Sequence, residues 1–255
     1  MSANDVVFAS TAADAEVVDA ITSHHAQLAG QLAVLTDGML SAVERDVDFE
    51  PARAAALAFL TGDLLPHAAA EEERLYPAAT RTERARPLVE SMIAVHRVIG
   101  SLVERIRTEP PVRSAASGHA LRVVFDAHLI DENERILPIV AANADVSLAE
   151  VIHGMHDLLG DHHVTAGDEP AHACGCGEHD TEDPVLDVRE VPHSIRHATV
   201  FGAFDAVPAG GTLVLVAPHD PIPLLHQLGD RTSGPLEIHY EQRGPEAWRL
   251  RLTKR

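Results

Sequence analysis

Apolar residues recur at steps of three and four through most of the first 160 residues, as in Val18, Ile21, Leu28 and Leu32. This spacing is typical of the buried face of bundle helices. We predict long helices near residues 11–44, 51–80, 84–108 and 112–142, and a shorter helix near 147–160. Prolines stand at several of these boundaries, where helices commonly begin or end. The short connections predict an antiparallel four-helix bundle with up-down-up-down topology.

The pattern changes twice beyond residue 160. The stretch "DHHVTAGDEPAHACGCGEHDTEDP" is rich in Gly, Asp and His and predicts a flexible linker over residues 161–184. Residues 185–255 alternate short apolar strands with helical segments in the order βαβαββ, with Asp220 expected to cap the second helix and Pro221 as its first residue. We therefore expect an α plus α/β protein with a helical domain over 11–160 and a two-layer α/β domain over 185–255.

The pattern H-x-x-x-E-x-E-R-x-x-P occurs twice, as "HAAAEEERLYP" at 67–77 and "HLIDENERILP" at 128–138. Residues four apart lie on one helix face, so His67 and Glu71 point the same way, as do His128 and Glu132. The closing proline of each copy lies about 15 Å along the axis from its histidine. We expect each helix to end or kink at that proline, which places the His–Glu pairs well inside the bundle.

The two remaining helices each carry one histidine on the apolar face, His25 and His96. A single histidine in such a position is usually structural, but here four helices contribute one and two add a carboxylate. Buried carboxylates without a partner cost several kcal/mol each, and a cation removes that cost. The sequence predicts a metal centre, and mixed His and carboxylate ligands suit iron, manganese or zinc. The predicted ligands are His25, His67, Glu71, His96, His128 and Glu132. The alternative is a structural bundle whose histidines have protein partners.

The order of these six residues, with the tails "EEERLYP" and "ENERILP", resembles the hemerythrin family in its bacterial HHE cation-binding branch, over roughly residues 15–142. The resemblance implies a non-haem centre of two iron ions, of the Fe–O–Fe type, with the two glutamates bridging and the histidines as terminal ligands. Family members bind oxygen, respond to nitric oxide, or handle iron and peroxide.

One position departs from the family pattern. Many members carry a second histidine one turn after His96, where this chain has Gly100. His24, Glu72 and Tyr76 are candidates to complete the centre, and the sequence does not rank them. Within the adjacent pair at 24 and 25, only His25 is in register with the apolar face, so we expect His24 to be exposed or to support a ligand by hydrogen bonding.

The second domain resembles DUF2249, which is related to the TusA/SirA sulfur-carrier fold, in "LDVREVPHSIRHATVFGAFDAVPAGGTLVLVAPHDPIPLL" and "GPEAWRLRL". His193 stands where sulfur carriers have a cysteine, so we expect no persulfide relay. In the linker, Cys174 and Cys176 with two nearby histidines are either a soft-metal site or incidental thiols. The residues name no partner protein for this domain.

The formal net charge of −19 disfavours nucleic acid or an anionic membrane as a partner. No apolar run is long enough to span a bilayer, the start lacks the features of a secretory signal, and two cysteines make no disulfide framework, so we expect a cytoplasmic protein. We favour binding or sensing of a small diatomic ligand, oxygen or nitric oxide, at the di-iron centre. The alternatives are an enzyme acting on peroxide or nitric oxide, and storage or donation of iron for repair; whether the protein is an enzyme stays open.

Overall fold

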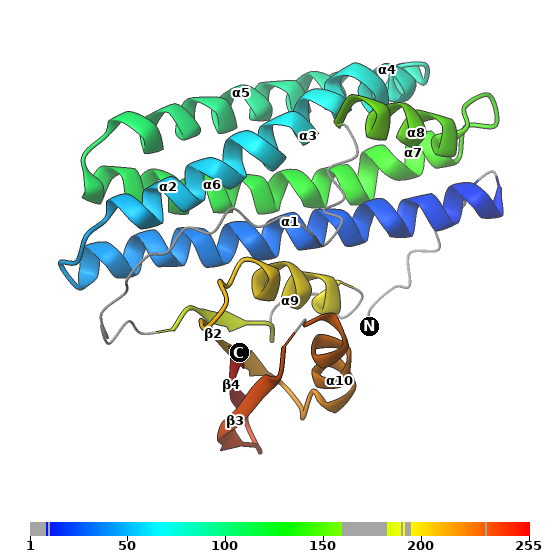
Figure 1. Cartoon of the computed structure of the whole chain (residues 1–255). Helices are drawn as coiled ribbons and strands as arrows, with labels where there is room; N and C mark the ends of the chain where they lie inside the picture. Colours follow the sequence, from blue (N-terminus) through cyan, green and yellow to red (C-terminus); the bar gives the residue numbers. More distant parts are fainter. Residues whose placement is uncertain (1–8, 10, 160–182, 190, 192–194, 233) are drawn as a thin grey trace.

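The computed structural model describes residues 9, 11–159, 183–189, 191, 195–232 and 234–255. Residue 160, residues 161–182 of the predicted linker with both cysteines, and His193 lie outside this part of the chain, so the predicted roles of the linker and of His193 stay predictions. Helices fill the first part of the chain and a small mixed sheet with two helices forms the second (Figure 1), which confirms the predicted fold class. Within the described residues, no helix combines the length and apolarity needed to cross a membrane.

The helical bundle follows the predicted order. Its elements are α1 (Ala12–Glu44), α2 (Glu50–Phe59), α3 (Leu65–Ala70), α4 (Tyr76–Ala79), α5 (Arg86–Thr108), α6 (Pro111–Asp131), α7 (Leu137–Ala141) and α8 (Leu148–Leu159). Short π-helical turns join several of them: η1 (Leu60–Leu64), η2 (Glu71–Leu75) and η4 (Glu132–Ile136), while the 3₁₀ turn η3 (Glu83–Ala85) precedes α5. The α2–α4 series is therefore one long helical arm, as are α6 and α7.

Capping contacts fix the start of the bundle. The Thr11 side chain accepts a hydrogen bond from the Asp14 backbone N–H at 3.1 Å and caps α1. Asp14 is buried, and its carboxylate also accepts a hydrogen bond from the Leu148 backbone N–H at 2.9 Å. One buried carboxylate thus joins the first turns of α1 and α8, which are far apart in the sequence.

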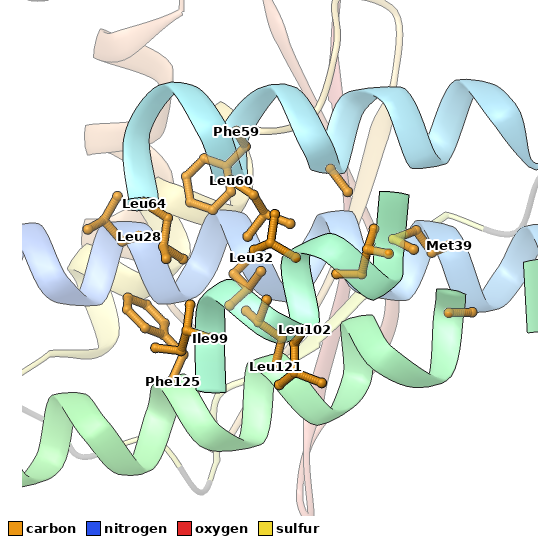
Figure 2. Close-up of a cluster of buried hydrophobic side chains, with 14 of the residues drawn as sticks. Leu28, Leu32, Met39, Phe59, Leu60, Leu64, Ile99, Leu102, Leu121 and Phe125 are labelled. Carbon is orange, nitrogen blue, oxygen red and sulfur yellow. The ribbon is translucent and has the colours of Figure 1, made fainter. Parts of the chain in front are cut away.

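Two apolar clusters make up the core of the bundle. One includes Leu28, Leu32 and Phe125 and is drawn in Figure 2; the other includes Val18 and Tyr76. Along α1, these clusters lie on either side of residue 25. The predicted His and Glu residues therefore form a polar layer between two apolar halves of the core.

The second unit is a four-stranded sheet in the order β1-β2-β4-β3 with two helices. Its elements are β1 (Val185–Asp187), α9 (Arg196–Asp205), β2 (Thr212–Ala217), α10 (Ile222–Arg231), β3 (Leu236–Arg243) and β4 (Trp248–Lys254). This confirms the predicted βαβαββ order. The predicted cap was wrong: Pro221 is the N-cap residue of α10, and the Asp220 carboxylate instead accepts a hydrogen bond from the Tyr240 hydroxyl at 2.9 Å.

Candidate metal centre

The structure brings all six predicted ligands together in one buried layer. They come from α1, the α3–η2 segment, α5 and the α6–η4 segment: His25, His67, Glu71, His96, His128 and Glu132. None is more than 8% exposed, although each carries a titratable side chain. Regular i, i+4 spacing on two helices and a single buried histidine on each of the others are sufficient to place them.

Glu71 lies between two pairs of histidines. Its Oε1 atom lies 3.3 Å from His25 Nε2 and 2.8 Å from His67 Nε2. Its Oε2 atom lies 3.5 Å from His96 Nε2, which is 3.3 Å from His128 Nε2. Glu71 therefore completes two compact groups, each with two imidazoles. Within each group, the three ligand atoms lie within 4.8 Å of one another.

Glu132 lies on the other side of the same layer. Its Oε2 atom is 3.5 Å from His128 Nε2 and 3.8 Å from His25 Nε2. It thus reaches one imidazole of each pair. Two carboxylates that each contact both pairs are the arrangement that bridging ligands of two cations require.

Several polar atoms in this layer are buried without a hydrogen-bond partner. They are His25 Nε2, both ring nitrogens of His67, His128 Nδ1, Glu71 Oε1 and both carboxylate oxygens of Glu132. His67 Nε2 and Glu71 Oε1 lie close enough for an ion pair but not in hydrogen-bonding geometry. Buried polar atoms are nearly always satisfied in folded proteins, and unsatisfied ones cost stability. A cation bound among them would remove this deficit, so the residues present fit a metal centre.

Comparison with known families also indicates a cation-binding domain in the first part of the chain. Residues 16–140 match the family model of the hemerythrin HHE cation binding domain, and residues 185–254 match DUF2249, an uncharacterized conserved protein family. The chain therefore carries a match to the hemerythrin HHE domain followed by a match to DUF2249, and we call the two matched regions the HHE domain and the DUF2249 domain. No curated protein and no solved structure gave a match.

In the HHE domain, hydrogen bonds at Nδ1 also orient the rings of two histidines. His25 Nδ1 lies 2.8 Å from Asn133 Oδ1, and His96 Nδ1 lies 2.8 Å from Glu72 Oε1. These oxygens accept hydrogen bonds, which places the proton on Nδ1 and leaves Nε2 free to bind a cation. Sequence reasoning missed this role, although a signal was present: Glu72 and Asn133 occupy the same position in the two copies of the repeat.

The closing prolines of the repeat explain the two π turns of the HHE domain at the site. η2 begins at Glu71 and η4 at Glu132, and Pro77 and Pro138 each lie six residues further on. Proline lacks an N–H, and its ring collides with the carbonyl four residues earlier in an α-helix, so a wider turn relieves the clash. Each helix then ends shortly after its proline, close to the predicted position.

The π turn in η2 gives Tyr76 its position. Its backbone N–H donates to the carbonyl of Glu71, five residues earlier. Five residues in an α-helix would separate the two side chains by about 140°, whereas a π turn brings them to nearly the same face. The Tyr76 hydroxyl is buried 3.3 Å from His96 Nε2. In the other repeat copy the same position is Leu137, which cannot bind a cation.

The charges of the layer shift the pKa values of its members. Burial alone lowers the pKa of His25, but the carboxylates of Glu71 and Glu132 outweigh burial and raise it. Burial raises the pKa of Glu71, yet His67 and His25 hold it well below its ordinary value. Burial, followed by the negative charges of Glu132 and Glu71, raises the pKa of Tyr76. Without a cation, His25 therefore keeps its proton to a higher pH than an ordinary imidazole.

The helix register of α1 is confirmed. His25 is fully buried, and His24 is exposed with its ring centroid 5.0 Å from that of His67. His24 therefore lies at the outer edge of the layer.

Proposed function

We propose that the HHE domain binds two iron ions, one at His25 and His67 and the other at His96 and His128. Glu71 and Glu132 would bridge them. The observation that carries this proposal is the division of the two Glu71 oxygens between the two histidine pairs. The mixed imidazole and carboxylate donor set suits iron, and iron would supply coordination positions open to a small ligand.

Of the three candidates to complete the centre, Tyr76 has the strongest support. The Glu72 carboxylate already accepts a hydrogen bond from His96 Nδ1, and His24 is exposed. Tyr76 alone of the three places a buried oxygen beside the inward-facing nitrogen of a proposed ligand. At Gly100, an added Cβ would meet no atom within 4 Å, so no other side chain fills that space closely.

We propose that the centre binds or senses a small diatomic ligand, oxygen or nitric oxide, in a cytoplasmic protein with domains over residues 11–160 and 185–255. The ligand type rests on the hemerythrin family, and the buried apolar surroundings of the layer suit a small uncharged molecule. Turnover of peroxide or nitric oxide is the second candidate, because the Tyr76 hydroxyl, if it stays unbound to the metal, places a proton donor beside the layer.

Metal analysis with an absorption spectrum tests the centre. We expect close to two irons per chain, with oxo-to-iron charge-transfer bands and no Soret band. Stoichiometric zinc or a bound porphyrin would contradict the di-iron centre. Anaerobic titration with nitric oxide, and separately oxygen release after peroxide addition, then separates the two functions: a stoichiometric reversible spectral change supports sensing, while sustained turnover over many equivalents supports an enzyme.

A further inference from the structure

The DUF2249 domain packs against the outer face of α1 through its first helix, α9 (Figure 1). Two glycines allow the helices to touch. A Cβ added at Gly30 would lie 2.1 Å from the Thr199 carbonyl oxygen, and one added at Gly202 would lie 2.0 Å from the Gln27 carbonyl oxygen. Real Cβ contacts are never this short, so any side chain at either position would force the helices apart.

The helix contact is continuous with the core of the second domain. Ala33 and Val34 of α1 are buried in the same apolar cluster as Val200 and Phe204 of α9. The contact is therefore part of a packed interior. At Gly30 and Gly202 one helix meets the backbone of the other, so the separation of the two axes at these points depends on backbone fit.

The contact with α9 lies on the side of α1 opposite the proposed ligand His25. Gln27, whose carbonyl oxygen faces Gly202, is two residues beyond His25 on the same helix. Two residues correspond to a rotation of about 200°, so the two positions point to opposite sides of α1. One turn of α1 thus faces the metal layer on one side and the DUF2249 domain on the other.

The interface between the domains is not packed throughout. Beyond the helix crossing, a cavity of 390 Å³ separates the end of α1 from the second domain, with Ala42 and Arg45 on one wall and Val207 and Thr212 on the other. Domains within one chain generally move relative to each other unless the interface between them is large and hydrophobic. The helix crossing is then the part of the interface that decides whether the domains stay together.

We propose that the DUF2249 domain docks on α1 in a manner linked to the metal centre, so that it reports whether the His25 half of the centre is occupied. This rests on the proposed function. A cation bound by His25 fixes the rotation and axial position of α1 in the bundle, and the glycine contacts fit only one such position. By thermodynamic linkage, docking strengthens cation binding by the same factor as the cation strengthens docking.

The test uses the full chain and glycine substitutions with matched controls. Gly30→Ala and Gly202→Ala disturb the contact from either side, and the second leaves the sequence of the bundle intact. Gly38→Ala in α1 and Gly229→Ala in α10 are the controls, because an added Cβ at either position meets no atom within 4 Å. Amide hydrogen exchange in α9 reports docking, and the rate of iron transfer to a chromogenic chelator reports the centre.

We expect both contact variants to exchange α9 amides faster and to release one of the two irons at least about fivefold faster, at the low end of typical coupling between sites. The controls should match the wild type. Removal of iron from the wild type should also speed exchange in α9. Unchanged iron release in variants that undock, or unchanged α9 exchange on iron removal, overturns the proposal. A wild type without iron instead refutes the proposed function, and its metal analysis shows this independently of exchange.

Discussion

Replacing His25 with alanine tests the division of the centre into two halves. His25 and His67 share one Glu71 oxygen, and His96 contacts the other. The substitution removes one of two imidazoles from one half and none from the other. We expect the metal content to fall from about two to about one iron per chain, because a site with one remaining imidazole lacks the usual donor number.

The expected change in Tm follows from the stabilisation that each bound iron gives to the folded state. With free iron near 100 times its dissociation constant, each site stabilises the fold by about 2.7 kcal/mol. For a chain of this size that corresponds to roughly 5–10 °C in Tm. The difference in Tm between loaded and metal-free protein should therefore be about halved by His25→Ala. Taking this difference removes the direct cost of the mutation, which is present in both states.

His24→Ala is the matched control, since its side chain is exposed and adjacent. It should keep both irons and the full difference in Tm, measured by calorimetry beside metal analysis. Reversed phenotypes would mean that His24, and not His25, supplies a ligand to the metal. Loss of both irons in His25→Ala would refute two separable halves.

Three further substitutions or conditions test the surroundings of the layer. Asn133→Ala should weaken iron binding about 10–100-fold in chelator competition, because the His25 ring loses its orienting partner. In metal-free protein, the raised pKa of His25 stabilises the fold fully below pH 6.5, and this stabilisation is lost as pH rises through the pKa of His25 in the folded state. The lowered pKa of Glu71 stabilises the fold above pH 4.5, and this stabilisation is lost as pH falls through the pKa of Glu71 in the folded state. The Tm of the metal-free protein should therefore be highest between pH 4.5 and pH 6.5. Glu71→Gln should reduce the fall in Tm above pH 6.5, and an unchanged fall would contradict this reasoning. Pro77→Ala should allow an α-turn and rotate Tyr76 by about 140°, abolishing NMR cross-peaks between its ring and the imidazoles; persistent cross-peaks would show that packing holds the π turn.

The sequence allowed the bundle and its polar layer to be predicted because both follow from regular spacing. Steps of three and four define one buried face, and residues such as His67 and Glu71 share it by geometry alone. The alternation of residues 236–254 defined the last two strands in the same way. These features depend on local periodicity, which a single sequence carries.

The features that were missed depend on contacts between distant segments. Asp220 is a residue type that commonly caps helices, but its carboxylate accepts a hydrogen bond from the Tyr240 hydroxyl on β3. Gly30 reads as a weak point inside a helix, and only the neighbouring backbone of α9 shows why a side chain is excluded. The orienting role of Asn133 required knowing which helix faces it.

The repeat makes the two halves of the centre alike, and its substitutions make them different. The hydrogen-bond acceptor behind His96 is a carboxylate, Glu72, whereas the acceptor behind His25 is the neutral amide of Asn133. A charged acceptor strengthens the hydrogen bond and makes the imidazole a better electron donor. The oxygen of Tyr76 also lies on the His96 side. The His96 half therefore has the richer set of donors.

This asymmetry predicts the order in which iron leaves. The His25 half has the weaker donors, and its helix is also the one on which the DUF2249 domain docks. A chelator should remove iron in two phases of similar amplitude, with the fast phase coming from the His25 half. His25→Ala should lack the fast phase, and Glu72→Gln should speed the slow one by about 10–100-fold, the usual effect of losing such a partner. A single phase in the wild type, or a slow phase unaffected by Glu72→Gln, would show that the hydrogen-bond partners behind the histidines do not distinguish the two ions.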